Sequence, residues 1–141
     1  MKKKSIYLFG ALILPLLVVW IFRMQYGYIY HAVDDVTINY SIINGESMLL
    51  PYIGIVLTKT LVIIQNIFPM INIYFIFLVS IYCISFGVYA NFFCKKKLYL
   101  LIPIVFIAQL ILIKYFSFSV IAYLSATAAT FLLFDKRYIS G

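Results

Sequence analysis

Two adjacent acids, Asp34 and Asp35, are the residues of this sequence whose type and position best suit chemistry. A carboxylate can act as a general base or as an oxygen ligand for a divalent cation such as Mg or Mn. Neighbouring helical residues point about 100° apart, so we expect one Asp to face a site. The other Asp would cap a helix, pair with Arg23 or His31, or face solvent. We therefore predict both as catalytic residues and candidate metal ligands; the alternative is a solvated loop end without chemistry.

Three further side chains in the same polar region could assist the carboxylates. His31 precedes them by three and four residues, within helical reach of both, and could orient a carboxylate or bind a phosphate. Arg23 and Lys59 could hold a lipid phosphate at headgroup level. Ordinary snorkelling explains these two basic side chains as well. His31, Arg23 and Lys59 are thus the predicted ligands for substrate or lipid phosphate.

The composition of the chain indicates a membrane protein. The chain has 141 residues, of which 66% are hydrophobic and 11% charged, whereas about a quarter of a soluble domain is charged. The predicted solvent is therefore lipid. The net charge of +7 does not indicate a nucleic-acid partner, because the basic residues gather at the ends of apolar runs. Cys83 and Cys94 show no metal-ligand spacing.

Four apolar runs predict a single all-α integral membrane domain over residues 1–141. The predicted transmembrane helices cover 5–22, 70–94, 98–113 and 117–134. The first run lacks a small-residue cleavage site, so we expect an uncleaved helix rather than a signal peptide. Residues 23–69 would then form one outer loop, with interfacial amphipathic helices in it.

The first of these loop helices is expected over 33–44. Two sets of residues recur at helical spacing and define two different faces. The predicted apolar face holds Val33, Val36, Tyr40 and Ile43, and the polar face holds Asp34, Thr37, Ser41 and Asn44. Asn44-Gly45 supplies a helix stop.

Residues 51–68 are nearly long and apolar enough to cross a membrane. However, Thr58, Lys59, Gln65 and Asn66 form a polar stripe, which is typical of a helix that lies in the interface or lines a cavity. Charge counting favours a helix that does not cross, because eight basic residues then share one side against three on the other. The eight are Lys2–Lys4, Lys95–Lys97, Lys136 and Arg137. We therefore expect a multi-pass plasma-membrane protein with cytoplasmic termini and the Asp-Asp loop outside.

The order of these parts resembles the start of GT-C membrane glycosyltransferases. The resemblance rests on the basic N-terminus, the first span, "YHAVDDVTINYSIINGE" in the outer loop, "PYIGIVLTKTLVIIQNIFP" and the span "INIYFIFLVSIYCISF". More specifically, the chain resembles multi-span proteins of Gram-positive bacteria that carry an Asp-Asp in this loop. Those proteins also have a stretch like "YFSFSVIAYLSATAATFLL".

The resemblance implies transfer of a sugar from a polyprenyl phosphate carrier to a cell-envelope acceptor on the outer face. By position, the base or metal-ligand role falls on Asp34 or Asp35, and residues 51–68 would shape the lipid-carrier cavity. Family members are several times longer, so we expect a truncated frame, a fragment or a remnant that is inactive alone. The alternative is a small non-catalytic four-span protein, either an accessory to a lipid-sugar flippase or a structural subunit.

Overall fold

The computed structural model describes residues 13–21, 33–45, 53–113 and 117–134, and these residues form helices joined by short turns. This confirms the predicted all-α class for the described part of the chain. A helix over 13–21 precedes five labelled helices. These are α2 (Val33–Ile43), α3 (Ile55–Ile67), α4 (Ile73–Lys95), α5 (Leu101–Ile113) and α6 (Phe118–Phe134).

Helix α4 is the longest described helix and the centre of the arrangement. Its 23 residues make it the one described helix long and apolar enough to cross a membrane. At 1.5 Å per residue it extends over about 34 Å, against about 30 Å of bilayer hydrocarbon. Helices α3 and α6 are apolar but shorter, with 13 and 17 residues. One helix thus reaches spanning length, and the four-span arrangement stays a prediction.

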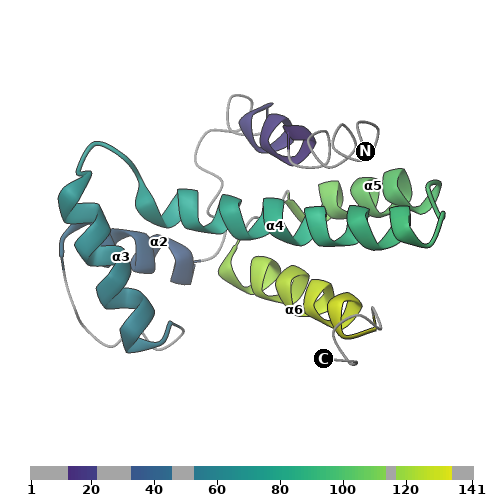
Figure 1. Ribbon diagram of the computed structural model, residues 1–141. Helices are drawn as coiled ribbons and strands as arrows, with labels where there is room; N and C mark the ends of the chain where they lie inside the picture. The colour runs from purple at the N-terminus through teal and green to yellow at the C-terminus, as the bar shows by residue number, and fades with distance from the viewer. Residues whose placement is uncertain (1–12, 22–32, 46–52, 114–116, 135–141) are drawn as a thin grey trace.

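Helices α5 and α6 lie along α4, and α2 and α3 lie at the end where α4 begins (Figure 1). Aromatic rings provide much of this packing. The Phe86 ring of α4 meets the Phe106 ring of α5 edge-on at 5.4 Å between centroids. The Tyr89 ring meets Phe131 of α6 in the same way at 5.3 Å. Such edge-to-face pairs add stability beyond the area that they bury.

Helix α6 is rich in small residues between Ser125 and Thr130, and this segment packs on α4 in part. Ala128 is buried in a cluster with Tyr89 and Phe93 of α4. The hydroxyl of Tyr89 donates to the Leu124 carbonyl at 3.0 Å and is hydrogen-bonded to the Thr127 hydroxyl. The remaining small residues at the end of the stretch are exposed. Only one side of the small-residue segment therefore packs on α4.

Helix α2 forms where the periodicity predicted it, but it buries a different face. The expected apolar face is wrong: Val36, Tyr40 and Ile43 are about half exposed or more. The buried residues are Asp35, Ile38, Ser41 and Ile42. A buried carboxylate displaced the apolar stripe, because the rotation that brings Asp35 to its partners turns the predicted stripe outward. The predicted stop is confirmed, since Gly45 has a left-handed φ of +71°.

Helix α3 divides the predicted polar stripe between two environments. Thr58 and Gln65 are buried, whereas Lys59 and Asn66 are exposed. The Gln65 side chain joins α3 to α4, because its Oε1 accepts from the Ile73 backbone N–H at 3.1 Å. Its Nε2 also donates to the Phe68 and Pro69 carbonyls, each at 3.4 Å. The polar residues of the stripe thus fix the turn between α3 and α4.

Candidate active site at the start of the long helix

Asp35 is a buried carboxylate that ties three helices together. Its side chain is 2% exposed. The Tyr74 hydroxyl, in the first turn of α4, donates to Oδ1 of Asp35 at 2.5 Å. The backbone N–H of Phe118, the first residue of α6, donates to the same oxygen at 2.8 Å. One carboxylate on α2 therefore connects the beginnings of α4 and α6.

The beginning of α6 explains why a carboxylate belongs there. The first backbone N–H groups of a helix have no partner within it, and the helix dipole favours negative charge at that end. Asp35 accepts from the N–H of Phe118, and the Ser117 hydroxyl accepts from the N–H of Val120 at 3.3 Å. Two of the unpaired donors are thus satisfied, one locally and one by a residue 83 positions away.

Asp34 is placed differently from its neighbour. It is exposed, and it stands in the first turn of α2, where an acidic residue is favourable to the helix dipole. Because Asp35 fixes the rotation of α2, Asp34 is held on the outer side of the helix. The structure therefore separates the pair into one buried connector and one exposed carboxylate, as the 100° angle between them requires.

The other predicted site residues are brought together only in part. Lys59 is exposed on α3, the helix that packs beside α2. His31 and Arg23 lie outside the described residues. Among the residues that the structure describes, no group of three or more His, Cys, Asp or Glu could hold a metal ion. A cation site at Asp34 and Asp35 stays a prediction, and Asp34 is the residue that presents exposed oxygens.

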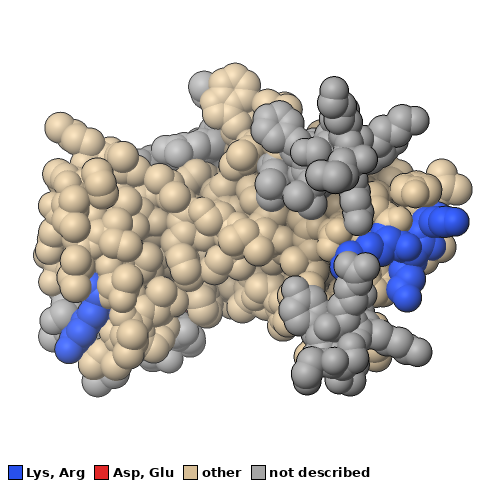
Figure 2. Space-filling model, in the orientation of Figure 1, with Lys and Arg blue, Asp and Glu red and all other residues tan. Residues whose placement is uncertain are grey.

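The site has a defined position along α4. Tyr74 lies in the first turn of that helix and Lys95 in the last, 21 residues further on. At 1.5 Å per residue this separates them by about 32 Å. In Figure 2 a cluster of basic side chains lies where α4 ends, and a single basic side chain stands at the opposite end, where α2 and α3 lie. The acidic site and the Lys95–Lys97 cluster thus occupy opposite ends of the molecule.

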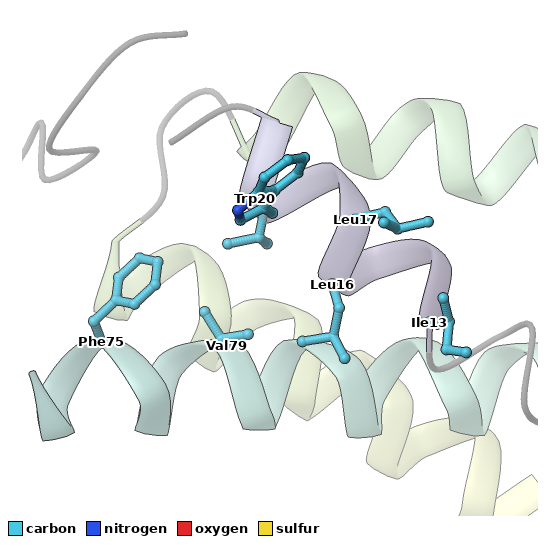
Figure 3. Close-up of a pocket in the computed structure, with 7 residues that line it drawn as sticks. Ile13, Leu16, Leu17, Trp20, Phe75 and Val79 are labelled. Carbon is cyan, nitrogen blue, oxygen red and sulfur yellow. The ribbon is translucent and has the colours of Figure 1, made fainter. Parts of the chain in front are cut away.

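An apolar groove runs beside the site along α4 (Figure 3). It has a volume of about 380 Å³ and lies between the 13–21 helix and the first half of α4. Its lining consists of Ile13, Leu16, Leu17, Val19, Trp20, Phe75 and Val79. Phe75 follows directly on Tyr74, so one end of the groove adjoins the residue that holds Asp35. The lining suits a hydrocarbon chain rather than a polar ligand.

No family model, curated protein or solved structure matches this chain.

Tyr74 is the site residue that the sequence reasoning missed. It falls inside an apolar run and was counted as part of a span. A signal was present nonetheless, because a buried Tyr hydroxyl usually needs a hydrogen-bond partner, and Tyr74 begins a helix otherwise rich in apolar residues. The Asp-Asp pair was a candidate acceptor. The Phe118 amide could not be inferred, since a backbone donor carries no residue-type signal.

Proposed function

We propose that this chain is the N-terminal part of a GT-C-like glycosyltransferase. It would move a sugar from a polyprenyl phosphate carrier to a cell-envelope acceptor on the outer face of the plasma membrane. The observation that carries the proposal is the separation of the two aspartates. Asp35 holds α2 to α4 and α6 through its hydrogen bonds, whereas Asp34 stays exposed on the helix whose rotation Asp35 fixes.

The proposed orientation follows from the two ends of α4. Lysines are enriched on the cytoplasmic side of membrane helices. With Lys95–Lys97 on that side, the first turn of α4 reaches the outer side, and Tyr74 and Asp35 bring α2 with it. The exposed polar side chains Lys59 and Asn66 of α3 support a position at the outer interface.

In this reaction Asp34 acts as the general base. Its carboxylate takes the proton from the acceptor hydroxyl as that oxygen attacks the anomeric carbon of the sugar. The bond between the anomeric carbon and the carrier phosphate breaks, and polyprenyl phosphate leaves with the bonding electrons. Asp35 and Tyr74 are positioning residues, because they touch only the scaffold that holds Asp34. Lys59, Arg23 and His31 would bind the carrier phosphate, and Asp34 is the carboxylate that would offer oxygens to a divalent cation (Mg or Mn).

The groove is the proposed binding site for the polyprenyl chain of the carrier. Its lining is apolar throughout, and its Phe75 end adjoins the residue that hydrogen-bonds Asp35. A carrier that lay along α4 would therefore bring its phosphate end toward α2. A groove of this volume falls within the range of specific ligand sites.

Trp20 provides a direct test of the groove, because it is the only tryptophan of the chain and is 58% exposed. We expect a polyprenyl phosphate with a brominated chain to quench Trp20 fluorescence even when it makes up only a small fraction of the total lipid. Phosphatidylcholine brominated to the same extent should quench less at equal concentration. Leu16→Trp in a Trp20→Phe background should report the same preference from one turn away on the same helix. Equal quenching by both lipids would contradict a carrier site.

The activity is tested with the longest natural form of the protein in purified membranes. Polyprenyl phosphate carrying a radiolabelled sugar is supplied with cell-envelope acceptor, and transfer is compared with membranes that lack the protein. The proposal expects label in the acceptor only when the protein is present. Absence of transfer across the polyprenyl-linked sugars supplied, together with a bound carrier, would favour the second candidate function.

That second candidate is a non-catalytic membrane protein, such as an accessory to a lipid-sugar flippase or a structural subunit. Its favouring observation is that packing alone accounts for Asp35, which satisfies Tyr74 and the start of α6. In that case Asp34 would serve only the dipole of α2. The two candidates differ in whether neutralising Asp34 changes a rate.

A further inference from the structure

The end of α4 opposite the acidic site carries a second surface, made of Lys96, Lys97, Leu98, Tyr99 and Leu100. All five side chains are exposed, and the apolar ones strongly so, with Leu98 at 46%, Tyr99 at 54% and Leu100 at 82%. Two cations are thus followed directly by three exposed side chains that favour a nonpolar or interfacial environment. This surface is called the lysine–leucine turn below.

The backbone of the lysine–leucine turn is rigid and specific. The Leu98 N–H donates to the Phe93 carbonyl at 2.9 Å and the Lys97 N–H to the Cys94 carbonyl at 3.2 Å. This is the Schellman arrangement, in which the residue after the C-cap is left-handed and usually glycine. Here it is Lys97, with a φ of +60°. A left-handed backbone is higher in energy for lysine than for glycine, and at this position the turn places the charge of Lys97 at the end of α4.

The described part of the chain offers no carboxylate to this surface. Both carboxylates that the structure describes, Asp34 and Asp35, belong to α2 at the other end of α4. Lys96 lies over the Phe92 ring, with Nζ 6.0 Å from its centroid, which holds it along the helix side. The cations are therefore directed to the level at which lipid headgroups begin.

From this charge and exposure we infer that the lysine–leucine turn binds the anionic phospholipid headgroups of the bilayer surface at that end of α4. Lys96 and Lys97 would contact headgroup phosphates, while Leu98, Tyr99 and Leu100 enter the boundary between headgroups and acyl chains. Charge complementarity identifies the partner, because basic residues next to a membrane helix attract anionic lipid. The inference does not depend on any catalytic activity of the other end.

The full chain is reconstituted in phosphatidylcholine bilayers that contain spin-labelled phosphatidylglycerol or spin-labelled phosphatidylcholine. We expect selective association of the anionic lipid, by about fivefold for each lysine at low salt, and loss of most of this preference at high salt. Lys96→Gln with Lys97→Gln, which leaves Lys95 in place, should lower the selectivity by about fivefold for each lysine removed. Asn66→Ala, an exposed polar position on α3 at the other end of the molecule, is the control and should retain it.

Lys97→Gly separates charge from conformation. Glycine adopts the left-handed φ without cost, so the turn stays formed and the protein stays folded, yet the anionic selectivity should fall by about fivefold. Lys97→Arg should keep it. Equal association of both lipids with the wild-type chain would overturn the inference. So would retained selectivity in Lys97→Gly and in the double glutamine variant.

Discussion

Asp34→Asn is expected to lower the rate of sugar transfer by about 100- to 10,000-fold, the usual contribution of a general base. The amide keeps the size of the side chain but cannot accept the proton of the acceptor hydroxyl. Because Asp34 is exposed and its neighbour anchors the helix, the variant should fold normally. The loss should fall on kcat, measured with polyprenyl-linked sugar and the longest natural form of the protein, while carrier binding stays within about twofold.

Two matched variants sharpen this result. Asp34→Glu retains a base one methylene further out and should recover part of the rate. Asn44→Ala changes an exposed polar residue just after α2 and should leave the rate unchanged. If Asp34→Asn transferred sugar at the wild-type rate, the exposed carboxylate would have no catalytic role, and the non-catalytic candidate would be preferred.

Asp35→Leu is expected to lower the free energy of unfolding by about 3 kcal/mol, because it removes the carboxylate that accepts from two donors. These are the Tyr74 hydroxyl and the Phe118 backbone N–H. Thermal unfolding in a fixed detergent, followed by circular dichroism, measures the change. Asp34→Leu, at the adjacent exposed position, should cost less than about 1 kcal/mol, since only the interaction with the helix dipole is lost.

A double-mutant cycle distinguishes the hydrogen bond from general packing damage. Tyr74→Phe alone should destabilise the wild-type chain by about 1.5 kcal/mol, since it removes a hydrogen bond to a carboxylate. In the Asp35→Leu background the hydrogen bond to the carboxylate is already absent, so the same change should cost clearly less. Equal costs in the two backgrounds would show that Tyr74 and Asp35 are not energetically coupled.

Helix positions in this chain could be predicted from sequence because they depend on local patterns. The apolar run at 70–94 became α4 at Ile73–Lys95, and the periodic segment at 33–44 became α2 at Val33–Ile43. Asn44-Gly45 ended α2 as expected. Each of these depends on residues within a few turns of one another, so neighbours in the sequence carry the information.

The rotation of α2 could not be predicted because it depends on a distant contact. Periodicity placed Val36 and Tyr40 inward, yet Asp35 turned inward toward Tyr74 and the start of α6. The hydrogen bonds of a buried carboxylate outweighed the burial of a half-apolar face. In the same way, Thr58 and Lys59 belong to one polar stripe in sequence but to opposite environments in the fold. Apolar content alone does not distinguish a protein-facing surface from a lipid-facing one.

The position of α2 relative to the membrane is the premise of the proposed outer-face chemistry. Single cysteines at Asn44 and Lys97, introduced after Cys83 and Cys94 are replaced by serine, are labelled in intact cells with a membrane-impermeant maleimide. We expect the cysteine at 44 to react in intact cells and the cysteine at 97 to react only after permeabilisation. Labelling of 97 from outside with protection of 44, or protection of both positions in intact cells, would contradict an extracytoplasmic Asp34.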